Sequence, residues 1–352
     1  MKKILFIAPG NSTHSLRWIS YFKKKFKIYW VSAHPFIKEI DFATNYNFGK
    51  NFIFFILSPF FLLIYAVKIK PDIIHVHSIA RNLYASIFLI FFFKKRMIFT
   101  PWGSDIYFPN FLIKKLQNFF LKKAIFICDS FLLKEKIKKI SSKNLIYKIN
   151  FGINCSFFNK KQFNKKNLNS KKIVFCPRGY DDIYNNFLIL KMIHKLKHRI
   201  SNYIFIFVGR DGIKKKENID FSKKLQVSNL CIFISQVNQN QLRYYYNISE
   251  IVISASRSDA GISSAVAEAM SCESIVLITN NRDNPFWIKN GYNGFLFKND
   301  DLKDIVKKFE AILKLDYSNK QMIRRNARRT QIENNNFSTE MSKVNSVYNS
   351  IY

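Results

Sequence analysis

Short apolar runs alternate with longer amphipathic stretches through the first half of the chain. The short runs predict buried strands, at residues 3–8, 26–32, 73–77, 96–100 and 125–129. The stretches between them predict helices, at residues 15–25, 52–67, 80–93 and 111–123. Strands that alternate with helices are typical of a parallel sheet whose crossovers are right-handed.

The same alternation begins again after a polar stretch at residues 159–172, which has the composition of an interdomain linker. The second half predicts strands at residues 173–176, 203–209, 230–234, 251–254 and 274–279, and helices at 186–196, 263–270 and 302–315. A chain of 352 residues exceeds what one hydrophobic core usually serves. We therefore predict an α/β protein with two Rossmann-like, doubly wound parallel-sheet domains, at residues 1–165 and 166–330. Residues 331–352 are either a tail or a helix that returns to the first domain.

Two loops of the first half have residues that suit chemistry, and ligands of doubly wound sheets bind where strands end. The predicted strand at 73–77 ends in His75 and His77, whose rings share one face of the strand. The His77 ring could donate a hydrogen bond to a hydroxyl or accept its proton, or it could simply cap the strand. After the strand at 96–100, Asp105 either presents a free carboxylate or caps a short helix.

Two loops of the second half suit a phosphorylated ligand. Arg178 follows the predicted strand at 173–176, where its guanidinium fork suits a diphosphate, although an ordinary surface arginine fits equally well. A run of small residues leads into the helix predicted from Ser263, whose free N–H groups and dipole can hold a phosphate. Glu268 lies just over one turn into that helix. Its carboxylate could bind ribose hydroxyls or point to solvent.

The formal net charge of +34, from 57 Lys and Arg against 23 Asp and Glu, bears on the candidate partners. A field of this size attracts polyanions such as nucleic acid, anionic lipid headgroups and phosphorylated substrates. AT-rich codon usage explains the excess equally well, since Lys, Asn, Ile and Phe are all over-used. The aromatic residues lie mainly in apolar strands and helices rather than between basic residues, so we expect no nucleic-acid partner.

Cysteine spacing and apolar run lengths indicate the compartment. The five cysteines have no CxxC or metal-ligand spacing, which favours a reduced, cytoplasmic location. We expect no signal peptide, because the first apolar run is too short for one. The apolar runs at 52–67 and 83–93 are shorter than the roughly 20 residues of a membrane span. With lysine clusters beside them, they favour peripheral seating on the anionic inner face of the cytoplasmic membrane.

Taken in order, these segments resemble glycosyltransferase family 4 over most of residues 1–315. The resemblance is carried by STHSLRW at 12–18, WGSD at 102–105, Pro177-Arg178 with Tyr184-Asn185, and the segment from Ser258-Asp259 to Glu268-Ala269-Met270. It implies the GT-B fold, in which two Rossmann-like domains face a cleft, and a retaining mode of glycosyl transfer.

The resemblance also implies a role for each candidate site residue. His77, Asp105 and Glu268 would be the catalytic residues, and Glu268 would also bind the donor ribose. The diphosphate of the donor would lie near Arg178 and the helix start at Ser263 and Ser264. The remaining donor-side residues would be Gly209, Arg210 and Val237 beside the nucleotide, and Asp259 and Gly261 beside the sugar. The acceptor side would be formed by Gly10, Asn11, His14, Trp102 and Ser104.

The function implied is a retaining glycosyltransferase that moves a sugar from a nucleotide-sugar donor to a lipid- or glycan-linked acceptor in cell-surface polysaccharide or lipopolysaccharide synthesis. We expect no cofactor and no metal, because the chain lacks an Asp-x-Asp motif. Two alternatives remain open, a nucleotide-sugar epimerase of the same fold and a non-enzymatic basic protein that binds nucleic acid. The chain departs from the family pattern at Ile183, where Lys is usual, at Ala260, where many members have Glu, and at Glu273, where Gly is usual.

Overall fold

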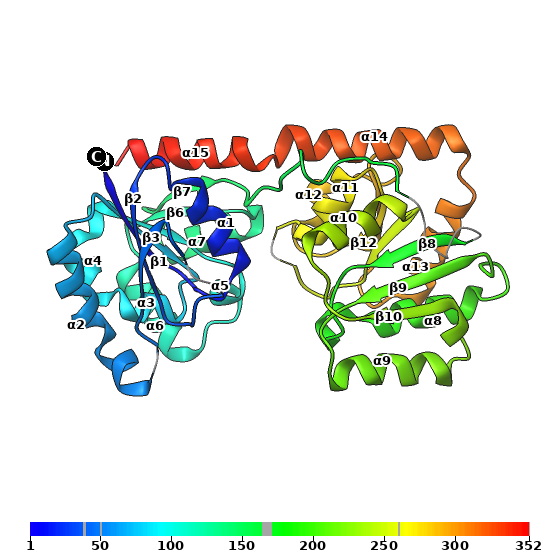
Figure 1. Cartoon of the computed structure of the whole chain (residues 1–352), viewed down its shortest axis with the longest axis horizontal. Coiled ribbons are helices and arrows are strands. Elements are labelled where there is room, and N and C mark those ends of the chain that lie inside the picture. Colours follow the sequence, from blue (N-terminus) through cyan, green and yellow to red (C-terminus); the bar gives the residue numbers. More distant parts are fainter. Residues whose placement is uncertain (38–39, 50, 164–170, 260, 352) are drawn as a thin grey trace. The chain divides into compact units, whose positions relative to one another are not determined.

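The structure is a computed structural model that describes residues 1–37, 40–49, 51–163, 171–259 and 261–351. The chain divides into two compact units. The first unit comprises Met1–Gly152 and Ser338–Tyr352, and the second comprises Ile153–Phe337 (Figure 1). Each unit is built on one parallel sheet with helices packed against it, which confirms the predicted α/β class and the Rossmann-like architecture.

The sheet of the first unit has seven strands in the order β3-β2-β1-β4-β5-β6-β7, and every neighbouring pair is parallel. The strands are β1 (Lys3–Ile7), β2 (Lys27–Ser32), β3 (Ala43–Asn47), β4 (Ile73–His77), β5 (Met97–Thr100), β6 (Ile125–Cys128) and β7 (Leu145–Lys148). The helices are α1 (Thr13–Tyr21), α2 (Phe52–Ile69), α3 (Arg81–Ala85), α4 (Ile87–Phe93), α5 (Ser104–Tyr107), α6 (Phe111–Phe120), α7 (Phe131–Ile140) and α15 (Phe337–Asn349), with a 3-10 turn η1 (Lys94–Arg96). Because the strands are parallel, the loops after β1, β4 and β5 meet at one edge of the sheet.

Both faces of this sheet are covered, which is why its central strands are continuous apolar runs. One face packs against α2, α3 and α4 through buried leucines that include Leu62, Leu83 and Leu89. On the opposite face lie α1 and α15, where the rings of Phe22 and Tyr348 are 4.9 Å apart. The first unit therefore has a helical layer on each face of its sheet.

Some elements of this unit carry no apolar signal in the sequence. β3 exposes Thr44, Asn45 and Tyr46, so it lacks the apolar run that marks the other strands.

The helix predicted at 80–93 is split into α3 and α4 at Ser86, whose hydroxyl donates to the carbonyl of Asn82 at 2.6 Å. Serines that bond back in this way bend helices.

The sheet of the second unit has six strands in the order β10-β9-β8-β11-β12-β13, again all parallel. The strands are β8 (Lys172–Cys176), β9 (Tyr203–Val208), β10 (Cys231–Ile234), β11 (Ile251–Ser254), β12 (Ile275–Thr279) and β13 (Phe295–Phe297). The helices are α8 (Asn186–Leu196), α9 (Ile213–Lys224), α10 (Gln239–Ile248), α11 (Ser264–Ser271), α12 (Asn284–Trp287), α13 (Leu302–Leu313) and α14 (Tyr317–Asn334), with 3-10 turns η2 (Asp182–Tyr184) and η3 (Ser228–Leu230). Apolar clusters lie on both faces of this sheet as well.

The chain passes from the first unit to the second after residue 152, whereas the sequence placed the boundary at residue 165. The segment after residue 152 is bonded into the second unit: the Ile153 N–H donates to the Asn335 carbonyl at 2.8 Å, and the Lys161 N–H donates to the Asn247 side chain at 2.7 Å. Of the predicted linker, residues 164–170 lie outside the described residues.

The sequence predicted either a tail or a helix that returns to the first domain at residues 331–352. In the structure these residues form the last turn of α14 and then α15. α14 belongs to the second unit and α15, from Ser338 onward, to the first. α15 buries Met341, Val344 and Tyr348 against the first sheet. The chain passes between the units twice, after Gly152 and after Phe337. Near these two points, within the first unit, the Glu340 carboxylate accepts the Asn150 N–H at 2.7 Å.

A residue with a left-handed backbone lies two positions after the end of α11. Glu273 has a φ of 61°, and it ends the helix through two hydrogen bonds of 3.0 Å, from its own N–H to Met270 and from the Ser274 N–H to Ala269. Residues with a Cβ are disfavoured in this conformation, which glycine adopts freely. The geometry therefore accounts for glycine being usual at this position in the family that the chain resembles.

We predict that Glu273→Gly raises the free energy of unfolding by about 1 kcal/mol, because it relieves the left-handed strain. The measurement is urea denaturation followed by circular dichroism. As a control, Lys307→Gly in the middle of α13 should lower the free energy of unfolding by about 1 kcal/mol. A Glu273→Gly variant less stable than the parent would show that the side chain at this position contributes more than the strain costs.

Candidate active site

His77 ends β4 at the edge of the first sheet and is almost fully buried, with 1% of its surface exposed. Its ring lies 4.2 Å from that of His75 and 5.0 Å from that of Trp18, edge-on. Among the described residues, its Nε2 has no hydrogen-bond partner. Burial lowers the pKa of His77 to about 3. The imidazole is therefore neutral at pH 7, with one ring nitrogen available to a ligand.

The ring of His75, which packs against that of His77, belongs to a chain of hydrogen bonds. Its Nδ1 lies 2.6 Å from the hydroxyl of Tyr348, and its Nε2 lies 2.7 Å from that of Thr100. The indole N–H of Trp18 donates to the Tyr348 oxygen at 3.4 Å. An indole N–H can only donate, so Tyr348 accepts from Trp18 and can pass its own proton toward His75. The sequence did not indicate Tyr348, because 273 residues separate it from His75.

The Asp105 carboxylate links two loops of the first unit through hydrogen bonds. Its carboxylate accepts the backbone N–H of Ile79 at 2.7 Å and that of Trp102 at 3.0 Å, which ties the loop after β4 to the loop after β5. Burial raises the pKa of Asp105, while these backbone donors act in the opposite direction. The carboxylate is therefore not free, and it does not cap a helix either: Asp105 lies within α5, whose N-cap residue is Gly103, and it accepts N–H groups from outside that helix. The structure assigns Asp105 to shaping the edge around His77.

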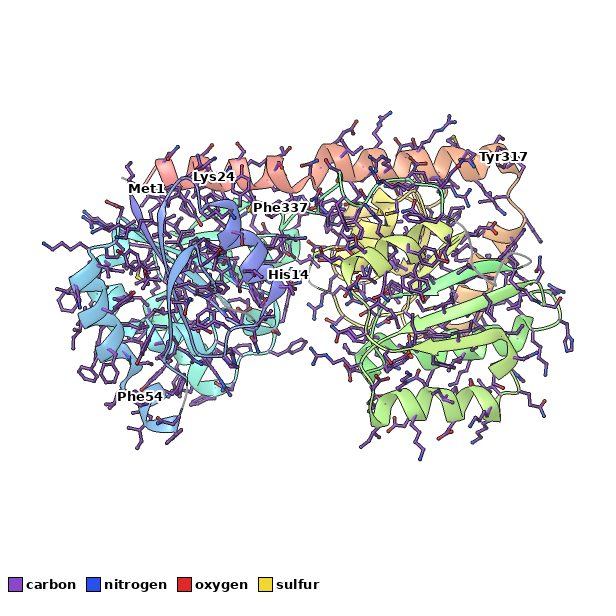
Figure 2. The ribbon with its side chains drawn as sticks, viewed as in Figure 1. Met1, His14, Lys24, Phe54, Tyr317 and Phe337 are labelled. Carbon is purple, nitrogen blue, oxygen red and sulfur yellow. The ribbon has the colours of Figure 1, made fainter. Side chains whose placement is uncertain are left out.

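The five predicted acceptor-side residues lie in the loop after β1, in α1 and in the loop after β5. The Gly10 N–H donates to the Ser32 hydroxyl at 2.7 Å, and a Cβ at this glycine would lie 2.9 Å from the Phe36 ring. His14 projects from α1 and its ring is 6.3 Å from that of Trp102 (Figure 2). Asn11 and Ser104 are exposed. The fold therefore gathers these residues at the same sheet edge as His77.

A cavity of about 890 Å³ opens at the edge of the second sheet, between the loops after β8, β9 and β10. It is lined by Gly179, Tyr180, Gly209, Arg210, Gln236 and Val237, among others. The Tyr180 hydroxyl donates toward the Ile234 carbonyl, 2.7 Å away, and so braces the ring against the strand ends. Gly209 is required there, because a Cβ would lie 2.6 Å from the Tyr180 ring. Three of the predicted donor residues, Gly209, Arg210 and Val237, thus line one cavity.

Arg178 lies beside this cavity and is paired with Asp259. One guanidinium nitrogen is 2.6 Å from the Asp259 carboxylate, and the guanidinium lies over the Tyr184 ring, 4.8 Å from its centroid. The Arg178 side chain is 19% exposed, and its Nε has no partner among the described residues. The structure therefore joins two predicted donor residues that are 81 positions apart.

α11 begins close to this ion pair. Ser263 caps the helix and accepts the Val266 N–H at 3.4 Å, so the backbone N–H groups of Ser264 and Ala265 have no helical partner to their N-terminal side. Gly261 precedes the cap, and Ala260, one of the departures from the family pattern, lies outside the described residues. The positive end of the helix dipole is thus placed at the loop that holds Asp259.

Glu268 turns inward from α11 and is 8% exposed, which rules out the solvent-facing alternative. Its carboxylate accepts the Tyr246 hydroxyl at 3.1 Å. Burial and the Glu268 charge raise the pKa of Tyr246 well above its usual range, and the charge of Arg178 acts against them. Arg178, Glu268 and Tyr246 therefore share one electrostatic environment. Tyr246 was missed by the sequence reasoning because it lies in α10, a largely polar helix that the apolar pattern did not indicate.

The position where the family usually has a lysine is taken by Ile183, which is 43% exposed in η2. A lysine from elsewhere lies next to it: Lys214 lines the cavity, and its Nζ is 3.0 Å from the carboxylate of Asp182. No spacing rule could have linked Lys214 to Arg178, because they follow different strands. Within the described ranges, no group of three or more His, Cys, Asp or Glu is placed to hold a metal ion.

Two family profiles together match most of the chain. Residues 3–144 match the profile described as "Glycosyl transferase 4-like", and residues 156–330 match "Glycosyl transferases group 1". No curated protein matches the chain.

Several solved structures have the same fold. A glycosyltransferase from Rickettsia africae is 17% identical, with a TM-score of 0.78, over 99% of this chain and 98% of its own. Sucrose-phosphate synthase from Thermosynechococcus elongatus is 14% identical, with a TM-score of 0.85, over 100% and 99%. HepE from Anabaena, solved with UDP and glucose, is 14% identical, with a TM-score of 0.78, over 99% and 100%. These likenesses confirm the GT-B fold.

We predict that acid destabilises the protein through His77. In the unfolded chain a histidine takes up a proton near pH 6.5, whereas in the folded protein the pKa of His77 is about 3. Stability is therefore full above pH 6.5 and falls as the pH drops toward 3, by about 2 kcal/mol between pH 7 and pH 5 from this residue alone. Urea denaturation at both pH values should show that His77→Asn lowers the pH dependence by this amount. An unchanged pH dependence in the variant would mean that His77 is accessible to protons.

Proposed function

The chain belongs to the group 1 glycosyl transferases, enzymes of the EC 2.4 class, and on that premise we propose that it transfers a sugar from a nucleotide-sugar donor to a lipid- or glycan-linked acceptor. The observations that carry the donor proposal are the cavity lined by Pro177 and Gly179, on either side of Arg178, and the ion pair of Arg178 with Asp259, in the loop that leads into α11. HepE, solved with UDP and with UDP-glucose, lends support to a nucleotide-sugar donor.

The leaving group in such a reaction is a nucleoside diphosphate, and its negative charge grows as the sugar–phosphate bond breaks. Arg178 would stabilise that charge with its guanidinium, and α11 with its free N–H groups and dipole. To do so, Arg178 must exchange the Asp259 carboxylate for the diphosphate. Asp259 is then released beside the sugar. We propose that these groups act without a metal or a cofactor, and that Lys214 supplies the cation absent at Ile183.

The position of Glu268 suits the ribose of the donor. Its carboxylate is buried, already engaged with the Tyr246 hydroxyl, and held in the same environment as Arg178. A buried carboxylate gains most from accepting hydroxyl hydrogen bonds. The nucleoside would then extend toward Gly209, Arg210 and Val237, which line the cavity.

On the acceptor side, we propose that His77 orients the reacting hydroxyl or sugar and does not act as a nucleophile. Its depressed pKa makes it a poor base at neutral pH, but a neutral ring nitrogen can still form a hydrogen bond. The acceptor hydroxyl would attack from the face that the diphosphate leaves, which gives retention of configuration. The setting we propose is the cytoplasmic face of the inner membrane, in cell-surface polysaccharide or lipopolysaccharide synthesis.

The donor proposal predicts ligand-dependent stabilisation. A nucleoside diphosphate or nucleotide sugar present at 100 times its dissociation constant adds about 2.7 kcal/mol of stability, so the melting temperature should rise by several degrees. We expect one of the UDP, GDP or ADP families to give this rise. Arg178→Ala should abolish it, whereas Arg199→Ala, which removes an exposed arginine paired with Glu310, should retain it. A rise that persists in Arg178→Ala would place the diphosphate elsewhere.

The acceptor proposal predicts a different effect for His77. His77→Ala should lower kcat by about a hundredfold, because a positioned group contributes mainly to turnover. The dissociation constant of the donor should change little, since His77 belongs to the other unit. His198→Ala, on the surface of the second unit, serves as the control. Loss of donor affinity without loss of turnover would contradict the assignment, and epimerised donor without any acceptor would favour the epimerase alternative.

A further inference from the structure

α2 is apolar on every side, yet most of it is not buried. Its 18 residues have a mean hydropathy of 2.3, and 28% of them are buried. The buried residues, Ser58, Pro59, Leu62, Ala66 and Ile69, face the sheet. The opposite side has Ile53, Phe60 and Ile64, which are 57–67% exposed. A surface helix normally has polar residues there, because apolar side chains gain nothing from contact with water.

Neighbouring helices extend this apolar side into one surface. The ring of Phe60 is 4.7 Å from that of Phe88 in α4, and Phe91 of α4 is 5.5 Å from Phe120 of α6. We call the exposed residues Ile53, Phe60, Ile64, Phe91, Phe92 and Phe119 the phenylalanine surface. Phe54 lies at the outer end of α2 (Figure 2). A contiguous apolar surface of this kind marks a place where something apolar binds.

The charges around the phenylalanine surface indicate which apolar partner fits. Residues 52–123 contain ten Lys and Arg and two acidic residues, Asp72 and Asp105. Asp105 is buried, and Asp72 accepts the Lys3 N–H at 2.8 Å. Two copies of this surface placed face to face would bring two sets of uncompensated cations together. An anionic lipid surface would neutralise the same cations while it covers the aromatic rings.

The connections of α2 exclude a span through the bilayer. β3 precedes it and β4 follows it, and both strands belong to the same sheet. A spanning helix would place its two ends on opposite sides of the membrane. α2 also packs on the sheet along its length, from Ser58 to Ile69. It can therefore enter a membrane only sideways, with its axis in the plane of the interface.

We infer that the phenylalanine surface is a bilayer-seating face, in which the exposed rings of α2, α4 and α6 enter the acyl boundary of an anionic membrane. Lys68 and Lys70 at the end of α2, with Lys95 and Arg96 at the end of α4, then reach the lipid headgroups. This inference deepens the proposed function, because it names the phase that holds a lipid-linked acceptor. α2 starts after β3 ends, at the sheet edge that carries His77. An acceptor anchored in the same bilayer therefore reaches that edge directly.

Co-sedimentation of the full chain with vesicles tests this inference. Wild type should bind vesicles of phosphatidylcholine with phosphatidylglycerol, and bind pure phosphatidylcholine vesicles much more weakly. Phe60→Ser with Ile64→Ser should lower the affinity by about tenfold or more, since each replaces an inserted apolar group. Lys68→Gln with Lys95→Gln should lower mainly the salt-sensitive part of binding. The control variant is Met322→Ser with Ile332→Ser, which replaces two exposed apolar residues of α14 and should leave the affinity for vesicles unchanged.

Three results would overturn the inference. The first is wild-type protein that does not sediment with anionic vesicles. The second is a Phe60→Ser, Ile64→Ser variant that binds vesicles as wild type does. The third is a wild-type dimer, seen by light scattering, that this double substitution dissociates. Nucleotide-induced stabilisation is measured in the same variants without vesicles. If wild type shows no nucleotide-induced stabilisation, the result counts against the proposed donor. If wild type is stabilised by nucleotide but does not bind vesicles, the result counts against the bilayer-seating face alone.

Discussion

Parallel strand pairing is the constraint on which the rest of this molecule depends. Parallel strands need a crossover between each pair, and here most crossovers contain helices, which cover both faces of each sheet; the described residues between β2 and β3 contain none. In doubly wound sheets of this kind, ligands bind at the carboxyl ends of the strands. His77, Arg178, Gly209 and Asp259 all lie at a strand end or in the loop that follows one. The pairing thus concentrates the chemistry of each unit at one sheet edge.

The Arg178–Asp259 pair gives the Arg178 guanidinium a partner at the edge of the second sheet. A guanidinium left unpaired and largely buried would be costly, and Asp259 offsets that cost at 2.6 Å. A diphosphate offers more charge and more acceptor oxygens than one carboxylate, so it can displace Asp259 from the same fork. In the proposed donor site, this exchange would link donor binding to a change in the loop that leads into α11. The ion pair would thus set the free energy that a diphosphate must exceed in order to bind Arg178.

Sequence pattern predicted the elements whose apolar signal is strong. The strand at 73–77 and the helix at 186–196 coincide with β4 and α8, and the residues at the strand ends were found because apolar runs stop there. The pattern did not predict β3, α9 or α14, because their side chains are polar and their stability depends on tertiary contacts. Spacing rules gave neither the Tyr348–His75 contact nor the Arg178–Asp259 pair. Such contacts join distant positions and become visible only when the sheet brings them to one edge.

The central claim is that Arg178 and the start of α11 hold the donor diphosphate. A crystal structure with whichever nucleoside diphosphate raises the melting temperature tests it most directly. The account predicts phosphate oxygens bonded to the Arg178 guanidinium and to backbone N–H groups at the start of α11, with the Asp259 carboxylate turned away. A bound nucleotide that leaves the Arg178–Asp259 pair intact, with its phosphates in contact with neither group, would contradict it.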